Sequence, residues 1–232
     1  MVDFIALDAD DTLWYNERLY AVSQHALAEI LSPYAPSELV EQKLLEMETG
    51  NLPLYGYGIK SFTLSMVETA FDISGGQIPA SEIMKILNWA KNMLRAGVEL
   101  LPGVEKVLQS LSMQYKLLVI TKGDLLDQRS KLERSGIDHF FMDIEVVVEK
   151  TTQTYRDILK RHDIEPEDFL MVGNSLRSDI LPVLAIGAAA VYIPAEITWE
   201  HELVDTDHPD GYHEIESILH LPDLVATLNE GA

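Results

Sequence analysis

Five short apolar runs along the chain predict the strands of a sheet. They are Phe4–Leu7, Leu117–Ile120, Ile144–Val148, Phe169–Val172 and Ala189–Ile193. The runs are mostly apolar on both alternating faces, and each ends at a polar or glycine-bearing turn. Runs of this kind are typical of strands that helices cover on both sides of a parallel sheet.

Helical patterns separate the later strands. Apolar residues recur at helical spacing over Leu125–Arg134 and again over Tyr155–Arg161. Strands that alternate with helices predict an α/β fold built on a doubly wound, Rossmann-like parallel sheet. We assign residues 1–14 and 98–232 to this α/β core.

The interval 15–97 breaks the alternation, because its apolar pattern is helical only. Its stripes are Leu19, Val22, Ala26, Leu27 and Ile30, then Phe62, Met66, Val67 and Ala70, then Ile83, Ile86, Leu87, Ala90 and Leu94. Ser32-Pro33, Asn51-Leu52-Pro53 and Gly75-Gly76 are expected to interrupt the helices. Residues 15–97 are thus predicted to form a small all-helical domain inserted after the first strand. It is either an ordinary decoration or, as we favour, a lid over the strand ends.

The composition is ordinary for a globular protein, but the charge is strongly acidic. Lys and Arg total 17 against 38 Asp and Glu, which gives a formal net charge of −21. Nucleic acid and anionic membranes need basic surfaces, so neither is an expected partner. The chain has no cysteine, which excludes disulfides and thiolate chemistry. It has no basic leader segment and no apolar run long enough to span a membrane, so we expect a cytoplasmic protein.

Polar side chains follow the predicted strands at their carboxyl ends, where open α/β sheets bind their ligands. In chain order they are Asp8, Asp10, Asp11 and Thr12, then Thr121, Lys122 and Gly123, then Glu149 and Lys150, then Gly173, Asn174, Ser175, Ser178 and Asp179. Three aspartates within four positions repel one another, which raises at least one pKa unless a cation or a substrate uses them. We expect these groups to converge on one edge of the sheet.

This order of motifs resembles the haloacid dehalogenase superfamily, specifically its phosphatase branch. The residues that match the four motifs of the family are, in order, Asp8, Asp10 and Thr12, then Thr121, then Lys150, and in part Gly173, Asn174 and Asp179. A helical insert after the first motif is also a family trait. The resemblance therefore covers the whole chain.

The resemblance implies a Mg2+-dependent phosphohydrolase of a small phosphorylated molecule. Asp8 would attack phosphorus to form an aspartyl phosphate, and Asp10 would protonate the leaving oxygen and later deprotonate the attacking water. Thr121 would hydrogen-bond the phosphoryl oxygens, while Lys150 would neutralise them and restrain Asp8. A phosphate ester needs each of these functions: a nucleophile, a proton donor and charge neutralisation.

The Mg2+ ligands that the resemblance implies are Asp8, the backbone carbonyl of Asp10, Asn174 and Asp179. Asn174 departs from the family pattern, in which an acid is usual. It keeps a carbonyl oxygen but loses one negative charge, so Asp179 would become the principal acidic ligand of the fourth motif. Because Pro182 is tolerated only in the first turn of a helix, that helix is expected to begin at residues 178–179.

Further substrate-binding candidates flank these motifs. Thr12, Lys122 and Gly123 lie next to the predicted site, and Tyr57 and Lys60 belong to the insert. For Lys122, a solvated lysine is the simpler explanation. The segment that contains Tyr57 and Lys60 is also explained by a loop and the start of a helix.

Three other functions remain open for the same residues. The chain could be a haloacid dehalogenase or a phosphomutase of the same superfamily, or a catalytically weak phosphate-binding module whose metal site Asn174 has impaired. Asp10 disfavours the dehalogenase, since the displacement of halide needs no proton donor. The substrate and the oligomeric state are not determined by the sequence.

Overall fold

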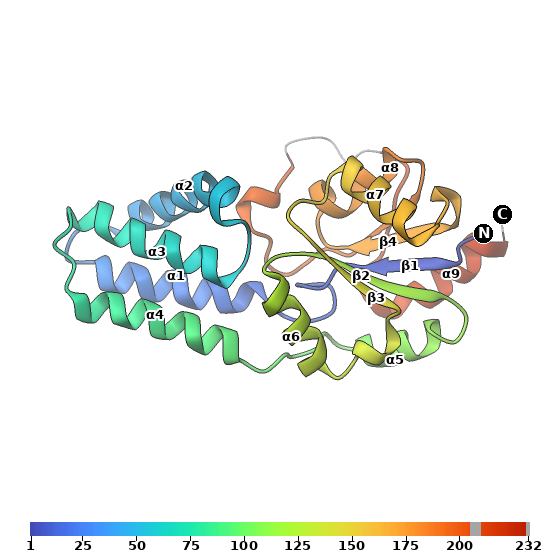
Figure 1. Ribbon diagram of the computed structural model, residues 1–232, viewed down its shortest axis with the longest axis horizontal. Helices are drawn as coiled ribbons and strands as arrows, with labels where there is room; N and C mark the ends of the chain where they lie inside the picture. The colour runs from blue at the N-terminus through green and yellow to red at the C-terminus, as the bar shows by residue number, and fades with distance from the viewer. Residues whose placement is uncertain (205–209, 231–232) are drawn as a thin grey trace. The chain divides into compact units, whose positions relative to one another are not determined.

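The computed structural model describes residues 1–204 and 210–230, and the chain divides into two compact units. One unit is Met1–Glu17 with Val98–Ala232, and the other is Arg18–Gly97. The first is an α/β unit, and the second is helical throughout (Figure 1). The borders fall at 17/18 and 97/98, whereas the sequence places them at 14/15 and 97/98.

The α/β unit contains a parallel sheet with the strand order β3-β2-β1-β4-β5-β6 in the described part of the chain. The strands are β1 (Phe4–Leu7), β2 (Lys116–Lys122), β3 (Asp143–Val147), β4 (Phe169–Gly173), β5 (Ala189–Tyr192) and β6 (His213–Glu214). The predicted fold class and the five predicted strands are confirmed. Strand β6 was missed because two residues carry no periodic signal. The strand order reverses between β1 and β4, and ligands of such sheets bind at this switch point.

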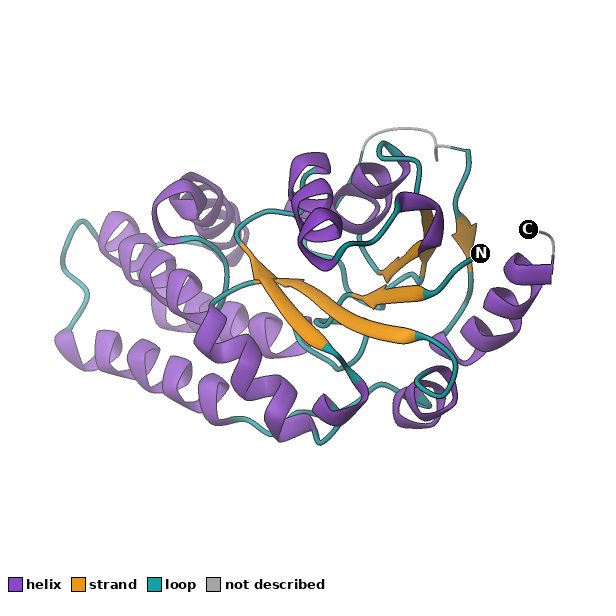
Figure 2. Ribbon diagram, turned by 45° about the vertical axis from the view of Figure 1, so that its right-hand side comes forward, coloured by secondary structure: helices purple, strands orange, loops and turns teal. Residues whose placement is uncertain are grey.

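Helices cover both faces of this sheet (Figures 1 and 2). Helices α5 (Val104–Leu111), α6 (Leu125–Ser135) and α9 (Leu221–Glu230) contribute to the core on one face, while α7 (Thr152–His162) and α8 (Leu181–Leu184) contribute to the core on the other. Within β1, Ile5 and Leu7 belong to the first core and Ala6 belongs to the second. A strand buried on both faces needs apolar residues at every position, which explains the uninterrupted apolar runs.

Both predicted helices of the α/β unit are confirmed. Helix α7 begins at Thr152, three residues before the predicted start at Tyr155. The earlier start has a local cause, since the side chain of Thr151 accepts a hydrogen bond from the backbone N–H of Thr154. This is the N-cap interaction that favours threonine at a helix start.

The helical unit consists of α1 (Glu17–Leu31), α2 (Ser37–Tyr55), α3 (Ile59–Ser74) and α4 (Ala80–Arg95). The helices pack around their own apolar core, which includes Leu27, Leu31, Leu44, Phe62, Met66 and Ile86. The expected breaks at Ser32-Pro33 and Gly75-Gly76 are confirmed, and Gly75 closes α3 with a left-handed φ of 58°. Within residues 1–204 and 210–230, no helix combines the length and the apolar character that a membrane span requires.

The expected break at Asn51-Leu52-Pro53 is wrong, because α2 continues through Pro53 to Tyr55. Proline removes one backbone hydrogen bond from this last stretch of the helix. A tertiary contact offsets the loss: the buried amide of Asn51 donates to Ser65 Oγ at 3.1 Å and to Glu68 Oε2 at 2.9 Å on α3. The side chains that hold this turn come from another helix, so the local sequence does not reveal them.

Candidate active site

Strand ends of the α/β unit place the motif residues along one edge of the sheet. Asp8 directly follows β1, and its backbone N–H donates to the carbonyl of Val172 on β4 at 2.8 Å. The parallel ladder thus extends one residue past β1 and fixes the backbone of Asp8. Lys150 follows β3, and Asp179 follows β4.

Asp8, Lys150 and Asp179 form a buried ion triad. Lys150 Nζ lies 2.5 Å from Asp8 Oδ1 and 2.6 Å from Asp179 Oδ1. Burial raises the pKa of Asp8 to about 7, even though Lys150 opposes this rise. Burial alone lowers the pKa of the Lys150 ammonium, but the carboxylates of Asp179 and Asp8 together raise it. Lys150 therefore stays charged and restrains Asp8, while Asp8 needs further positive charge to be fully ionised at neutral pH.

Oxygen atoms suited to a hard cation meet beside this triad. Thr12 Oγ1 lies 3.4 Å from Asp8 Oδ2 and 3.3 Å from Asn174 Oδ1. A hydroxyl has one proton and can donate to only one of these acceptors, so the carboxylate and amide oxygens converge without enough donors. Carboxylate and amide oxygens are Mg2+ ligands, and a dication would also lower the pKa of Asp8. The residues present therefore fit Mg2+.

Asp179 contacts Lys150 and the backbone of the loop after β4, and its role as a Mg2+ ligand stays a prediction. Its Oδ1 accepts from Lys150, and its Oδ2 accepts from the backbone N–H of Ser175 at 3.0 Å. Asn174, rather than Asp179, is the residue of the fourth motif whose side chain meets Thr12. In this structure Asp179 holds Lys150, and Gly173 is required beside it because a Cβ atom there would overlap the Asp179 carboxylate.

The helical segment that carries Asp179 begins earlier than residues 178–179. Its first turn, Leu176–Ile180, is a π-helical turn that leads into α8. Ser175 caps this turn, since its Oγ accepts from the backbone N–H of Ser178 at 3.0 Å. Pro182 does lie in the first turn of α8, but the wider turn before it extends the helix in the N-terminal direction.

Both oxygens of Asp10 are occupied by hydrogen-bond donors. Oδ1 accepts from Trp14 Nε1 at 2.7 Å and from Lys131 Nζ at 2.8 Å, and Oδ2 accepts from Gln128 Nε2 at 2.7 Å. The sequence reasoning missed Gln128 and Lys131. Both are buried polar residues on α6, three positions apart and next to the core residue Leu132. Polar residues on the inward face of an amphipathic helix were the available signal.

The third aspartate of the crowded turn has a structural role. Asp11 adopts a left-handed φ of 58°, and its carboxylate accepts from the backbone N–H groups of Asn16 and Glu17, each at 3.0 Å. These donors lie at the start of α1, where unpaired N–H groups favour an anionic partner. Burial raises the pKa of Asp11 to about 6. Of the three neighbouring aspartates, Asp11 thus stabilises the start of α1, while Asp8 and Asp10 belong to the candidate site.

The three candidates at the end of β2 contact different parts of the α/β unit. Lys122 Nζ is paired with Glu202, donates to Ser178 Oγ at 2.9 Å, and lies 3.7 Å from Glu149. The buried hydroxyl of Thr121 donates to the carbonyl of Lys122 at 3.2 Å. Gly123 has a φ of 138°, and a Cβ atom there would press against the side chain of Gln128.

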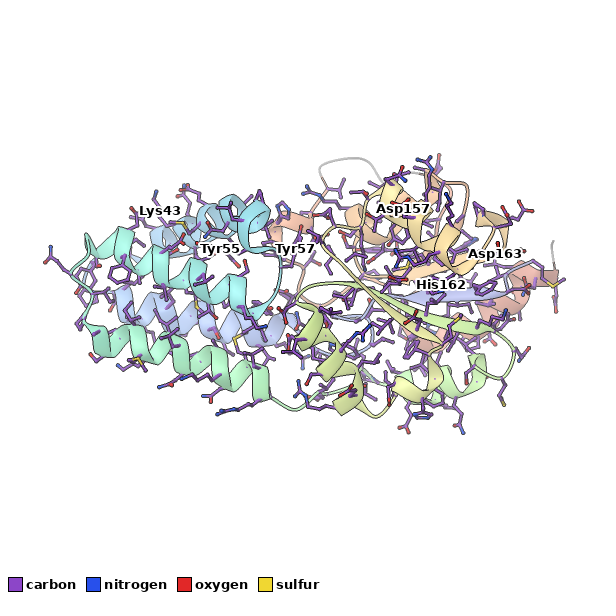
Figure 3. All side chains as sticks on the ribbon, viewed as in Figure 1. Lys43, Tyr55, Tyr57, Asp157, His162 and Asp163 are labelled. Atoms are coloured by element: carbon purple, nitrogen blue, oxygen red, sulfur yellow. The ribbon has the colours of Figure 1, made fainter. Side chains whose placement is uncertain are left out.

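The remaining candidates belong to the helical unit. Tyr57, labelled in Figure 3, lies in the connection between α2 and α3. Lys60 lies in the first turn of α3. Gly58, with a φ of 104°, precedes that turn. The role of Tyr57 and Lys60 in substrate binding stays a prediction.

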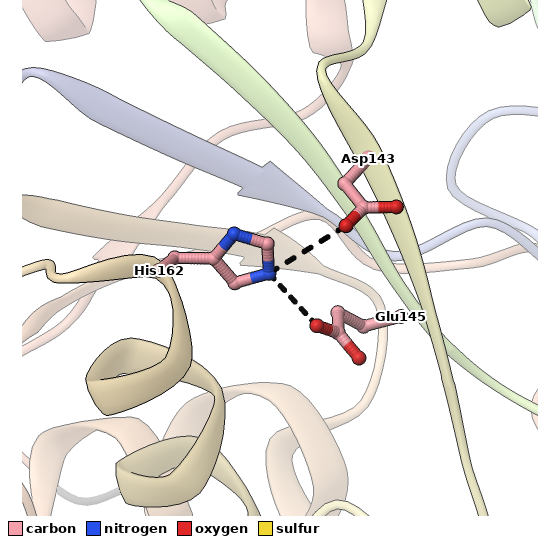
Figure 4. A group of neighbouring side chains, drawn as sticks. All are labelled: Asp143, Glu145 and His162. Carbon is pink, nitrogen blue, oxygen red and sulfur yellow. Dashed lines mark hydrogen bonds and ion pairs between the residues drawn. The ribbon is translucent and has the colours of Figure 1, made fainter.

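A second group of titratable side chains lies away from the strand ends. Glu145 on β3 and His162 at the end of α7 are 2.8 Å apart, and Asp143 lies 3.9 Å from His162 (Figure 4). Arg161 Nη1 lies 2.5 Å from Glu145 Oε2. The histidine and the arginine already serve as partners of Glu145, so ion pairing explains the group.

Comparison with known proteins agrees with the motifs and the sheet. The sequence pattern of the haloacid dehalogenase-like hydrolases matches residues 2–187. The chain belongs to this family. A glyceraldehyde 3-phosphate phosphatase of Methanothermobacter thermautotrophicus is 26% identical over 204 residues, which are 85% of this chain and 88% of the relative. An N-acylneuraminate-9-phosphatase of Mus musculus is 27% identical over 146 residues, 61% of this chain and 57% of the relative.

A solved structure shows a closer likeness. The crystal structure of a haloacid dehalogenase-like family hydrolase from Xanthomonas campestris is 37% identical, with a TM-score of 0.89 over 99% of this chain and 93% of that one. The predicted superfamily is confirmed by this likeness and by the family match. The predicted enzyme class, a phosphoric monoester hydrolase, is confirmed together with it by the phosphatases among the relatives.

Proposed function

We propose that the chain is a Mg2+-dependent phosphatase of a small phosphorylated metabolite and that it acts through an aspartyl phosphate on Asp8. The ion triad of Asp8, Lys150 and Asp179 carries this proposal. A nucleophile needs a fixed orientation and an ionised oxygen; Lys150 supplies the first by holding Oδ1 of Asp8 and favours the second, which a bound dication would complete. Aspartate attack forms the new phosphorus–oxygen bond as the ester oxygen leaves.

The residues that would hold Mg2+ are Asp8 and Asn174, with the backbone carbonyl of Asp10 and the carboxylate of Asp179 as the family resemblance implies. When bound, Mg2+ supplies charge neutralisation for the phosphoryl oxygens and for Asp8. Lys150 contributes a further positive charge beside Asp8. Thr121, at the end of β2, is the candidate donor to the phosphoryl oxygens.

A comparison of metal and substrate tests the proposal. Purified enzyme is assayed with an aryl phosphate in Mg2+ and after EDTA treatment, and phosphate release is expected to fall to background with EDTA and to return with Mg2+. A panel of phosphorylated metabolites follows, beginning with glyceraldehyde 3-phosphate and N-acylneuraminate 9-phosphate because relatives are phosphatases named for them. Release of chloride from a 2-chloro acid without metal would instead indicate a dehalogenase. Transfer of phosphate to a sugar without free phosphate would indicate a mutase.

Asp10 would supply the proton that the leaving oxygen requires. In this structure Oδ1 accepts from Trp14 and Lys131 and Oδ2 accepts from Gln128, so three of the four lone pairs of the carboxylate are used and the fourth, on Oδ2, can carry the proton. The donor to Oδ2 is a neutral amide, whereas one of the two donors to Oδ1 is the ammonium of Lys131. Oδ2 is therefore the oxygen better placed to carry the proton. Gln128 and Lys131, both on α6, hold the proposed acid Asp10 in position.

The dependence of rate on the leaving group tests the role of Asp10. Asp10→Asn is expected to lower kcat/KM for an alkyl phosphate by about 100-fold or more, the range of general acid catalysis. For an aryl phosphate with an acidic phenol the loss should be only a fewfold, because that oxygen leaves without a proton. Equal losses for both esters would assign Asp10 a role other than proton donation.

A further inference from the structure

Glu202 reaches the strand ends from the turn Glu200–Glu202, which follows β5. Its carboxylate is ion-paired with Lys122 and accepts from Ser175 Oγ at 2.5 Å and from Ser178 Oγ at 2.7 Å. The side chain of Glu202 is only 12% exposed. The turn is also fastened by Arg177, whose Nη1 donates to the carbonyl of His201 at 2.7 Å.

Lys122 belongs to the surroundings of the proposed active site. It directly follows Thr121, and its backbone carbonyl accepts from Gln128 Nε2 at 2.8 Å. The same Gln128 amide donates to Asp10. The backbone of Lys122 is thus linked to Asp10 through Gln128. The ammonium of Lys122 donates to Ser178 Oγ, next to Asp179 in the chain. A charge at Lys122 is therefore expected to act on a substrate that binds at these strand ends.

The lysines at these strand ends are balanced by carboxylates. Lys150 is held by Asp8 and Asp179, and Lys131 is held by Asp10. Lys122 is balanced mainly by Glu202, whose side chain is 12% exposed, and also lies 3.7 Å from the more exposed Glu149. Burial raises the pKa of Glu202, but Lys122 and the serine hydroxyls outweigh this effect and lower it to about 2, so Glu202 is ionised at any working pH. The two negative charges of a phosphate group would be neutralised by Mg2+. A second anionic group on the substrate would find no net positive charge nearby, because each of these lysines is already paired with a carboxylate.

We propose that Glu202 is a specificity-determining residue, which neutralises Lys122 and so makes the enzyme discriminate against phosphate esters that carry a second anionic group. The inference rests on the proposed phosphatase function. The substrates of the enzyme would accordingly be phosphate esters of neutral alcohols. The sequence candidate Lys122 then acts in specificity through its charge balance. Removal of Glu202 takes away the nearer and more buried of its two carboxylate partners, so more of the Lys122 charge acts on the substrate.

The test compares two esters that differ in one group, glycerol 3-phosphate and 3-phosphoglycerate, as competitive inhibitors of aryl phosphate hydrolysis. In Glu202→Gln the inhibition constant of 3-phosphoglycerate should fall about tenfold relative to that of glycerol 3-phosphate, because the loss of one buried carboxylate makes the surroundings of Lys122 more positive. The matched control is Glu200→Gln, which alters an exposed residue of the same turn and should leave the ratio unchanged. In the double variant Glu202→Gln, Lys122→Met the gain should disappear.

An unchanged ratio in Glu202→Gln, or a gain that persists without Lys122, would overturn the inference. A measurement on the wild-type enzyme applies even if Glu202→Gln does not fold. Added NaCl screens an attraction or a repulsion between exposed charges. Because Lys122 is balanced, 3-phosphoglycerate should not weaken relative to glycerol 3-phosphate as NaCl rises, and a relative weakening would also overturn the inference. Absence of aryl phosphate hydrolysis in the wild type would instead contradict the proposed phosphatase function itself.

Discussion

Replacing Asp8 by asparagine is expected to lower phosphate release by about a thousandfold or more, because the amide cannot form the aspartyl phosphate. The substitution nearly preserves shape, and Lys150 keeps Asp179 as a partner 2.6 Å away. The pKa of Asp8 is raised from 3.8 to about 7 by burial, so the stability associated with its protonated form is complete below pH 4 and is lost as the pH rises through 7. The amide of the Asp8→Asn variant has no charge to bury, so its melting temperature at pH 8 should not fall below that of the wild type.

The adjacent aspartate provides a matched control for Asp8. Asp11→Asn keeps an oxygen that can accept from Asn16 and Glu17, and asparagine tolerates the left-handed φ at this position. Its turnover should stay within a fewfold of the wild type. Measurement of kcat with an aryl phosphate and of thermal unfolding for both variants separates the two roles. Loss of turnover in Asp11→Asn as deep as in Asp8→Asn would show that the whole turn, rather than the nucleophile, had been disrupted.

The sequence predicts the site residues that follow the strands of the sheet. Asp8, Lys150 and Asp179 follow three different strands, and parallel strands bring their carboxyl ends to one edge whatever their separation along the chain. The convergence of these side chains therefore follows from strand order alone. Their division of labour does not, because it depends on which donor each oxygen meets. Asp179 shows this, since one of its oxygens is held by a backbone N–H that no pattern identifies.

The remaining parts come from elements whose contacts the sequence does not record. Gln128 and Lys131 hold Asp10 from α6, and Glu202 reaches Lys122 from an irregular turn after the last predicted strand. Such contacts are single long-range side-chain pairs with no period and no motif. The continuation of α2 through Pro53 has the same origin, because Asn51 anchors that turn to a different helix. Local pattern fixes elements and strand ends, and tertiary partners decide the rest.

Replacing Lys150 by methionine is expected to lower the free energy of unfolding by about 3–5 kcal/mol at pH 8, because it leaves two buried carboxylates without their shared cation. Asp8 and Asp179 would then repel each other, and their pKa values in the folded state would rise. Carboxyl groups with raised pKa values contribute stability that is complete below their unfolded pKa and is lost as the pH rises. The deficit of Lys150→Met relative to the wild type should therefore be smaller at pH 5 than at pH 8. Turnover should be lost with it, since the variant lacks the group that orients Asp8.

Lys160→Met supplies the matched control for this prediction, because Lys160 is an exposed lysine in the last turn of α7. Exposed charges contribute little to stability, so urea unfolding of Lys160→Met should resemble that of the wild type at both pH values. A deficit in Lys150→Met that is equal at pH 5 and pH 8 would mean that lost packing, and not unpaired carboxylates, causes the destabilisation. The pH dependence is thus the decisive observation, since only the electrostatic explanation links the stability of the core to the protonation of the proposed nucleophile.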